Sequence, residues 1–347
     1  MTTRNFIIYP ALLVGLFYLL HVGKSLLIPL VIAIFIWYLI NTLTEVLAKV
    51  PLGRNFRLPR GLAFSGALLI IASLIYFFVS TIAGNISKVV AAAPAYQQNL
   101  ELAIQRLLAA LPVKEHLDIG TLMGGVNLAS LARSMAMELT NFLGRGAIVI
   151  LYLIFLFLEQ RSFEGKLLAL VEGPERQKVA RSIISRIDRD IRMYLGIKTL
   201  TSLATGVLSY MIFSVVGLDY AEFWAFMIFL FNFIPTIGSI IATILPSLLA
   251  LVQFDGIGPF LVVIIGVTVV QQAIGSFLEP RLMGDQLNLS PLVILLSLAL
   301  WGRLWGISGM FLCVPMTAVT MIILSHFAQT RPLAVALSRK GKIKTEN

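Results

Sequence analysis

The fold of this chain is decided by residues 279–315, EPRLMGDQLNLSPLVILLSLALWGRLWGISGMFLCVP, where an acidic-proline turn leads into a long apolar segment. Arg303 is the single charge between residues 286 and 329, and it stands beside Gly302, Gly306 and Gly309. As one straight helix, residues 291–327 would be about 55 Å long at roughly 1.5 Å per residue, whereas the hydrocarbon core of a bilayer is about 30 Å thick. The segment is therefore expected to be two short arms that meet at the glycines, or a broken helix.

A second interrupted segment, FNFIPTIGSIIATILP, occupies residues 231–246. Pro235 removes a backbone donor and Gly238 tolerates unwinding, so free backbone amides and carbonyls are expected there. In lipid such groups need a partner from protein, water or solute, and Asn232, Thr236 and Ser239 add polar side chains at the same level. Two interpretations stay open. The segment lines a transport site, as broken helices do in secondary transporters, or it is a proline kink in which Asn232 caps a neighbouring helix.

Between these segments, Gln271, Gln272, Ser276 and Glu279 interrupt an apolar helix. Neighbouring residues on a helix point about 100° apart, so one amide is expected to bind another helix and the other to face the site. Buried polar groups in a membrane are costly and commonly functional. Arg303 is a candidate to meet an anionic or oxygen-rich substrate or to pair with Glu279, and the alternative is that it extends to the membrane interface.

The composition places the whole chain in a membrane. Of its 347 residues, 58% are apolar and 13% are charged, which predicts an all-α polytopic membrane protein. The net charge of +10 lies in short loops and the tail, without the basic and aromatic stripe of a nucleic-acid-binding surface. Cys313 is the only cysteine, which excludes a disulfide framework.

Hydropathy predicts eight transmembrane segments, of which the sixth and the eighth are the interrupted ones. They lie at about 5–22, 25–45, 61–83, 144–158, 195–217, 222–252, 258–278 and 290–327. The predicted divisions are transmembrane segments 1–3 (1–83), an extracytoplasmic helical excursion (84–143), segment 4 (144–158), a cytoplasmic basic amphipathic segment (159–194), segments 5–8 with the transport site (195–327) and a cytoplasmic basic tail (328–347). Within the excursion, two candidate helices lie near 86–110 and 128–143.

Basic residues set the predicted orientation. They gather after the second segment, within 159–194 and in the tail, and the positive-inside rule places these parts and both termini in the cytoplasm. For residues 172–194 two interpretations stay open, a helix that lies on anionic lipid and a solvated helix that packs on its neighbours. If the interrupted segments were full spans, Asp255 would lie inside and Arg281 outside. Hairpins would reverse both positions, and the excess length of the segments favours hairpins.

The sequence contains none of the common catalytic motifs. The histidines are scattered over different segments, and the sequence holds no HExxH, CxxC or nucleophile-elbow pattern. It also lacks a Walker A sequence, so a transporter of this sequence would be a facilitator or would be coupled to an ion gradient. We therefore expect no enzymatic activity, no cofactor and no metal.

The chain resembles the autoinducer-2 exporter family of bacterial permeases over nearly its whole length. The resemblance rests on NFIPTIGSIIATILP (232–246), EPRLMG (279–284), LSPLVILLSLALWG (289–302) and GISGMFLCVP (306–315), in the family's order and spacing. It implies a transporter of the bacterial inner membrane, a homopentamer with a moving substrate-carrying part. The implied substrate is autoinducer-2, a small hydroxyl-rich quorum-sensing molecule that can carry borate. Some relatives resemble sodium-proton antiporters instead, and Ser290 stands where the family often has histidine, so a proton role of that histidine does not carry over.

Residues and resemblance together predict the export of a small polar organic solute by secondary transport. The solute would need hydrogen-bonding partners, which the polar side chains of the later segments supply. The alternative, a sodium-proton antiporter, needs a membrane-buried carboxylate, and the nearby candidates Glu279 and Glu222 both lie at predicted segment ends. A second alternative is a membrane assembly protein that transports nothing.

The expected partners are the lipid bilayer, the solute, a coupling ion (H⁺ or Na⁺) and further copies of the chain in a homo-oligomer, and no nucleic acid. The candidate substrate-binding residues are the polar, glycine and proline residues of the later segments: Asn232, Pro235, Thr236, Gly238, Gln271, Gln272, Ser276, Glu279, Ser297, Arg303, Gly306 and Gly309.

Overall fold

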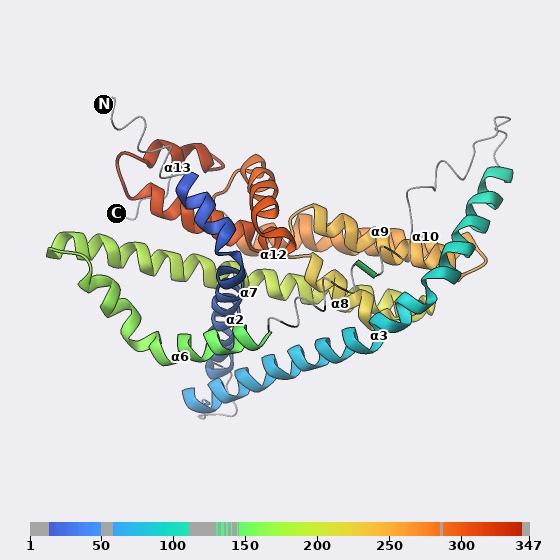
Figure 1. The fold of residues 1–347 in the computed structure, drawn as a ribbon, viewed down its shortest axis with the longest axis horizontal. Coiled ribbons are helices and arrows are strands. Elements are labelled where there is room, and N and C mark those ends of the chain that lie inside the picture. The colour runs from blue at the N-terminus through green and yellow to red at the C-terminus, as the bar shows by residue number, and fades with distance from the viewer. Residues whose placement is uncertain are drawn as a thin grey trace. The chain divides into compact units, whose positions relative to one another are not determined.

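The computed structural model of the chain describes residues 14–49, 58–110, 130, 133–134, 137, 140, 144, 146–284 and 287–341. Throughout these ranges the chain is helical, apart from turns, short connections and one isolated bridge between Leu289 and Ser338. Six of the described helices are long and apolar enough to cross a membrane. The predicted class, an all-α polytopic membrane protein, is confirmed, and Figure 1 shows the helices coloured in chain order.

Two compact units make up the fold, and neither is continuous in sequence. The first unit contains Met1–Ala67, Gly146–Ile197 and Met283–Asn347, and the second contains Leu68–Arg145 and Lys198–Leu282. Two long helices contribute residues to both units, α3 (Arg60–Ala110) and α7 (Pro174–Val216). Each unit therefore gathers helices from distant parts of the sequence.

In the first unit, α2 (Lys24–Lys49) packs on α6 (Gly146–Ala169) and on α12 (Pro291–Ser325). Residues 25–44 hold neither a charge nor a glycine, so a helix satisfies their backbone groups and leaves apolar side chains for packing. Phe35 of α2 meets Phe311 of α12 edge-on, with ring centroids 5.2 Å apart. The short helix α13 (Arg331–Leu337) packs on α12 and follows it in sequence.

In the second unit, the later part of α7 is accompanied by α8 (Ala221–Phe231), α9 (Ile237–Gln253) and α10 (Ile257–Gln272). The π-helix η1 (Ala273–Leu278) and α11 (Glu279–Met283) continue α10 directly. An apolar core joins these helices through fully buried side chains such as Phe213, Ile228 and Val267. Figure 1 shows α8, α9 and α10 in yellow to orange, and α9 packs against both of the others.

Large apolar side chains remain exposed along the membrane-length helices. Leu158 of α6, Val215 of α7 and Leu292 of α12 all lie at the surface. A water-soluble surface rarely carries so many exposed apolar groups, whereas lipid tails solvate them well. The exposed apolar surface therefore agrees with a multi-pass membrane protein.

Several helices cross the boundaries that hydropathy draws. The predicted third segment and the first candidate helix of the excursion form one helix, α3, of 51 residues. The predicted basic segment and the fifth transmembrane segment are likewise joined in α7, which has 43 residues. Residues 111–129, and most of the second candidate helix of the excursion at 128–143, lie outside the described residues.

Candidate functional site

The sixth predicted segment is a helical hairpin made of α8 and α9. Gln253, at the end of α9, donates from Nε2 to the carbonyl of Gly217 at 2.9 Å and accepts from the amide of Asp219 at 2.7 Å. The start of α8 and the end of α9 therefore lie together. With 11 and 17 residues, the two helices are about 16 and 25 Å long, each shorter than a hydrocarbon core of roughly 30 Å.

The tip of this hairpin adopts an unusual backbone conformation. The amide of Ile237 donates to the carbonyl of Pro235 at 2.5 Å, and Thr236 between them has φ 57° and ψ −62°. This is a γ-turn with a positive φ, which a β-branched residue rarely adopts. A Cβ added to Gly238 would lie 1.9 Å from the carbonyl oxygen of Phe231, so only glycine fits there. The structure thus holds the tip in a strained and crowded geometry, as is common at functional sites.

The eighth predicted segment, α12, is a second hairpin, and it belongs to the first unit. Gly306 has φ 63° and ψ −141°, which breaks the helix. The arms before and after it are about 22 and 28 Å long. A Cβ on Gly309 would lie 1.9 Å from the carbonyl oxygen of Trp301, so the arms meet closely. The amide of Ser290 donates to Leu337 at 3.0 Å, which ties the start of α12 to the residues after its end.

Both interrupted segments are therefore hairpins, which confirms the prediction that these two segments are broken. Gly302 and Gly306 have the four-residue spacing of a helix-packing motif, but Gly306 forms the turn of α12, and a Cβ on Gly302 would lie 2.9 Å from Met310 of the same hairpin. Within the first unit these glycines serve the packing of one chain on itself.

A buried polar face runs along the second-unit part of α7. Its members recur every three or four residues, which places them on one side of a helix: Lys198, Thr201, Ser202, Thr205 and Ser209. Intramembrane polar and ionisable residues commonly mark a substrate or ion pathway.

Two of the predicted site residues contact this face. Asn232, at the end of α8, donates from Nδ2 to Ser202 Oγ at 3.1 Å, and both side chains are buried. Glu279 accepts from Lys198 Nζ at 2.8 Å through Oε1 and at 2.9 Å through Oε2. The hydroxyl of Thr201 lies 3.5 Å from Oε2. With side-chain exposures of only 10% and 17%, Lys198 and Glu279 form a mostly buried ion pair.

The π-helix η1 decides where Glu279 points. In a regular α-helix the side chains of Gln271 and Glu279 would point about 80° apart, and the extra residue that a π-helix accommodates reduces this angle to roughly 20°. Gln271 and Glu279 therefore lie on nearly the same side. Gln271 Nε2 is buried without a protein partner in the described chain, whereas Gln272 is exposed and accepts from Ser276 Oγ at 2.7 Å.

The remaining candidate residues have other roles or other neighbours. Pro235, Thr236 and Gly238 shape the tip of the α8–α9 hairpin. Ser297 is buried in α12 and donates to the carbonyl of Ile294, while Arg303 is exposed near the turn of the same hairpin. Glu279 has Lys198 as its ion-pair partner within the second unit, and the alternative pairing of Glu279 with Arg303 stays a prediction. Ser297, Arg303, Gly306 and Gly309 belong to the first unit and the other candidates to the second.

Sequence reasoning missed Lys198, Thr201 and Ser202. A signal existed, because Lys198 is a charge inside a predicted transmembrane segment, and the hydroxyl residues after it keep helical spacing. The arginines of residues 159–194 indicate a helix at the membrane surface, and Lys198 follows them closely in sequence. In the described part of the chain, no group of three His, Cys, Asp or Glu side chains gathers as a metal site would require.

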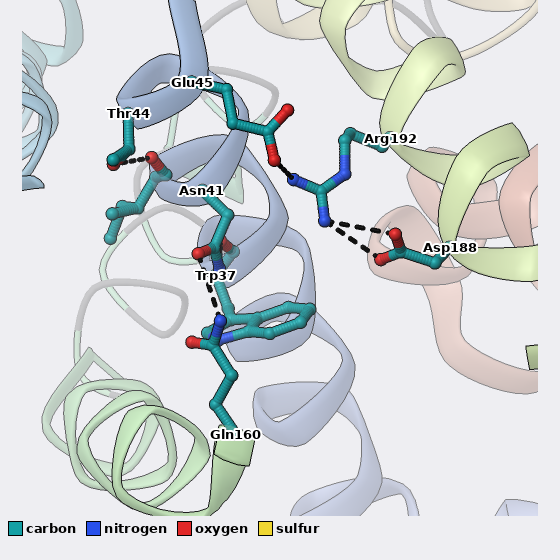
Figure 2. Close-up of polar contacts among 8 residues, drawn as sticks. Trp37, Asn41, Thr44, Glu45, Gln160, Asp188 and Arg192 are labelled. Carbon is teal, nitrogen blue, oxygen red and sulfur yellow. Dashed lines mark hydrogen bonds and ion pairs between the residues drawn. The ribbon is translucent and has the colours of Figure 1, made fainter. Parts of the chain in front are cut away.

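A separate polar network lies in the first unit, where α2, α6 and α7 meet (Figure 2). Arg192 of α7 donates to Glu45 of α2 at 2.6 Å and to both carboxylate oxygens of Asp188 at 3.1 Å. Trp37 Nε1 of α2 donates to Gln160 of α6 at 3.1 Å. The network joins three helices, and it neutralises part of the basic segment within the protein itself.

Comparison with known proteins agrees with this architecture. The sequence profile described as AI-2E family transporter matches residues 7–329. The chain belongs to the AI-2E transporter family. It is 28% identical over 324 residues to the AI-2 transport protein TqsA of Escherichia coli K12, covering 92% of this chain and 91% of that protein. It is also 28% identical to YrrI of Bacillus subtilis, over 89% of this chain and 88% of YrrI.

Membership of the AI-2E family makes this chain a transporter, and it matches the multi-pass architecture that the structure shows. A protein of Borreliella burgdorferi is 33% identical over 245 residues, which cover 70% of this chain and 67% of that protein. Both hairpins and the Lys198–Glu279 pair lie within the residues that the AI-2E profile matches.

Proposed function

We propose that this AI-2E transporter carries a small polar organic solute across the bacterial inner membrane by secondary transport, through the polar interior of its second unit. The observation that carries the proposal is the buried contact of α7 with Asn232 and Glu279. A membrane protein gains nothing in stability from such groups when apolar residues would pack as well. A solute with several hydroxyl groups would instead find donors and acceptors there.

Autoinducer-2 is the solute to test first, because a relative over nearly the whole chain is named an AI-2 transport protein. Its hydroxyl groups match hydroxyl, amide, ammonium and carboxylate partners. The proposed direction is export, and the proposed orientation has both termini in the cytoplasm, as the basic loops indicate. Asn232, Gln271, Thr201 and Glu279 are the proposed solute contacts.

A second candidate function is sodium-proton exchange. It is favoured by the burial of Glu279, which the sequence placed at the end of a segment and which the structure places against Lys198. A carboxylate in this position can bind a cation or a proton, as such groups do in transporters.

The experiment is flux measurement in proteoliposomes. Purified protein is reconstituted with labelled autoinducer-2, without a gradient, with a proton gradient and with a sodium gradient. We expect saturable autoinducer-2 flux above that of protein-free liposomes. Sodium-dependent proton movement without any autoinducer-2 flux would replace the proposal with the antiporter. The absence of both fluxes from protein that is correctly inserted would contradict the two functions together.

A further inference from the structure

Lys198 and Glu279 form a mostly buried pair of opposite charges that joins two candidate membrane spans. The sequences of α9 and α10 contain no charged residue, and α8 carries only Glu222, in its first turn. Arg281 follows on α11 but is exposed. Among the described helices α8, α9 and α10 with its continuation, the buried charge is that of the pair, and it sums to zero.

The number of protons on the pair fixes its charge. With one proton the pair is neutral, whether the proton resides on the amine or on the carboxylate. With two protons the pair carries one positive charge, and with none it carries one negative charge. An uncompensated charge in a low-dielectric interior is strongly disfavoured, so the one-proton form is the stable form when no charged cargo is bound.

Buried polar side chains continue from the pair along α7 as far as Ser209. Glu279 lies beside Lys198, and a Cβ on Gly266 would lie 3.0 Å from Cδ1 of Ile212, so α10 with its continuation runs antiparallel to this part of α7. Gln271 is therefore level with the part of α7 between Thr205 and Ser209. Gln271 Nε2 and Ser209 Oγ are both buried without a protein partner in the described chain. Such atoms are normally satisfied by water or by a ligand, which gives solute or water polar contacts up to the pair.

We propose that the Lys198–Glu279 pair sets the proton stoichiometry of transport by keeping the loaded site electrically neutral. A monovalent cation bound at the carboxylate requires the pair to release one proton, from Lys198, to the side from which the cation came. An anion of charge −1 requires the pair to take up one proton, which then moves with the anion. A neutral solute requires no proton exchange. This inference rests on the proposed transport function only for the choice of probe.

The test uses the full-length protein in liposomes that contain a pH-sensitive dye, with solute flux measured in parallel. The probes are autoinducer-2 in borate-free buffer, which is neutral, its borate ester, which carries one negative charge, and sodium ions. For the wild type we expect proton-to-cargo ratios of zero for the neutral solute and one for the ester, with the proton moving in the same direction. For sodium we expect a ratio of one, with the proton moving in the opposite direction.

Single variants separate the two groups. In Lys198→Gln the neutral form of the site is a protonated Glu279. This carboxyl can release its proton when a cation binds, so sodium keeps a proton-to-cargo ratio of one. It cannot take up a second proton, so flux of the ester is lost. In Glu279→Gln the neutral form is an uncharged Lys198, so the ester keeps its ratio of one and sodium exchange is lost. Flux of the neutral solute without proton movement is expected to remain measurable in both variants.

The matched control is Arg186→Gln/Asp190→Asn, which removes another buried ion pair of α7, in the first unit. It should leave all three ratios unchanged. Ratios that stay at wild-type values in both single variants, or a neutral solute that moves one proton, would overturn the proposal. If autoinducer-2 does not move at all but sodium exchanges with protons one for one, the proposed solute fails and the stoichiometric role of the pair stands.

Discussion

At the scale of single residues, Asn232 and Gln272 give opposite expectations although both are polar side chains in the segments that carry the site. Asn232→Ala removes the buried hydrogen bond to Ser202 and leaves that hydroxyl without its partner. Such a loss costs on the order of 1–3 kcal/mol, so we expect solute flux to fall by roughly tenfold or more. Gln272→Ala should stay near wild type, because Gln272 is exposed and pairs only with Ser276 on its own helix. Flux per inserted protein measures both, and equal losses would place Gln272 in the site.

A second prediction at this scale concerns Gly238. In Gly238→Ala the new methyl group would meet the carbonyl oxygen of Phe231 at 1.9 Å, a contact that only backbone movement relieves. We expect a loss of at least the roughly 1–3 kcal/mol typical of an overpacked core. Thermal unfolding in detergent measures it as a lower Tm. Gly258→Ala is the control, since nothing lies within 4 Å of its added Cβ, and similar Tm values for the two variants would contradict the tight hairpin.

Individual residues were predicted unevenly from sequence, for physical reasons. Pro235, Gly238, Gly306 and Gly309 are signalled by local backbone chemistry, which any single sequence displays. The partner of Glu279 is Lys198, which is distant in sequence. Because periodicity carries no information about which helices meet, the pairing needed the fold.

At the scale of elements, the hairpin of α8 and α9 makes a prediction about sidedness. Gln253 binds Gly217 and Asp219 together, so Asp219 and Asp255 should face the same compartment. In a Cys313→Ser background, we expect an impermeant thiol reagent to label Asp219→Cys and Asp255→Cys from outside and Arg281→Cys only from inside. Labelling of Asp219→Cys and Asp255→Cys from opposite sides would show that α8 and α9 together cross the membrane instead of forming a hairpin.

The elements themselves were partly predictable. Both broken segments were predicted because their apolar stretches are longer than one bilayer crossing needs and contain proline or glycine at their centres. The π-helix before Glu279 has no sequence signal as strong as those glycines and prolines, because the pattern of Ala273–Leu278 predicts an ordinary α-helix. Its presence changes which amide, Gln271 or Gln272, faces the interior.

At the scale of the whole molecule, we expect the chain to work as a homo-oligomer. This expectation comes from the family resemblance, since Gly302 and Gly306 are used within α12. Native mass spectrometry of the detergent-purified protein should give a multiple of the chain mass, with five copies expected. A protein that is monomeric in detergent and in nanodiscs, with full solute flux when reconstituted at one copy per liposome, would contradict it.

The hydrogen bonds between Gln253 and the backbone of Gly217 and Asp219 also have a consequence for how the chain enters the membrane during synthesis. During synthesis α8 leaves the ribosome first, and its 11 residues reach only about halfway through the hydrocarbon layer at roughly 1.5 Å per residue. The carbonyls of its last turn would then be left in lipid without a partner. We therefore expect the insertion machinery to retain α8 until α9 has emerged as far as Gln253, so that the two helices enter the membrane together as one unit.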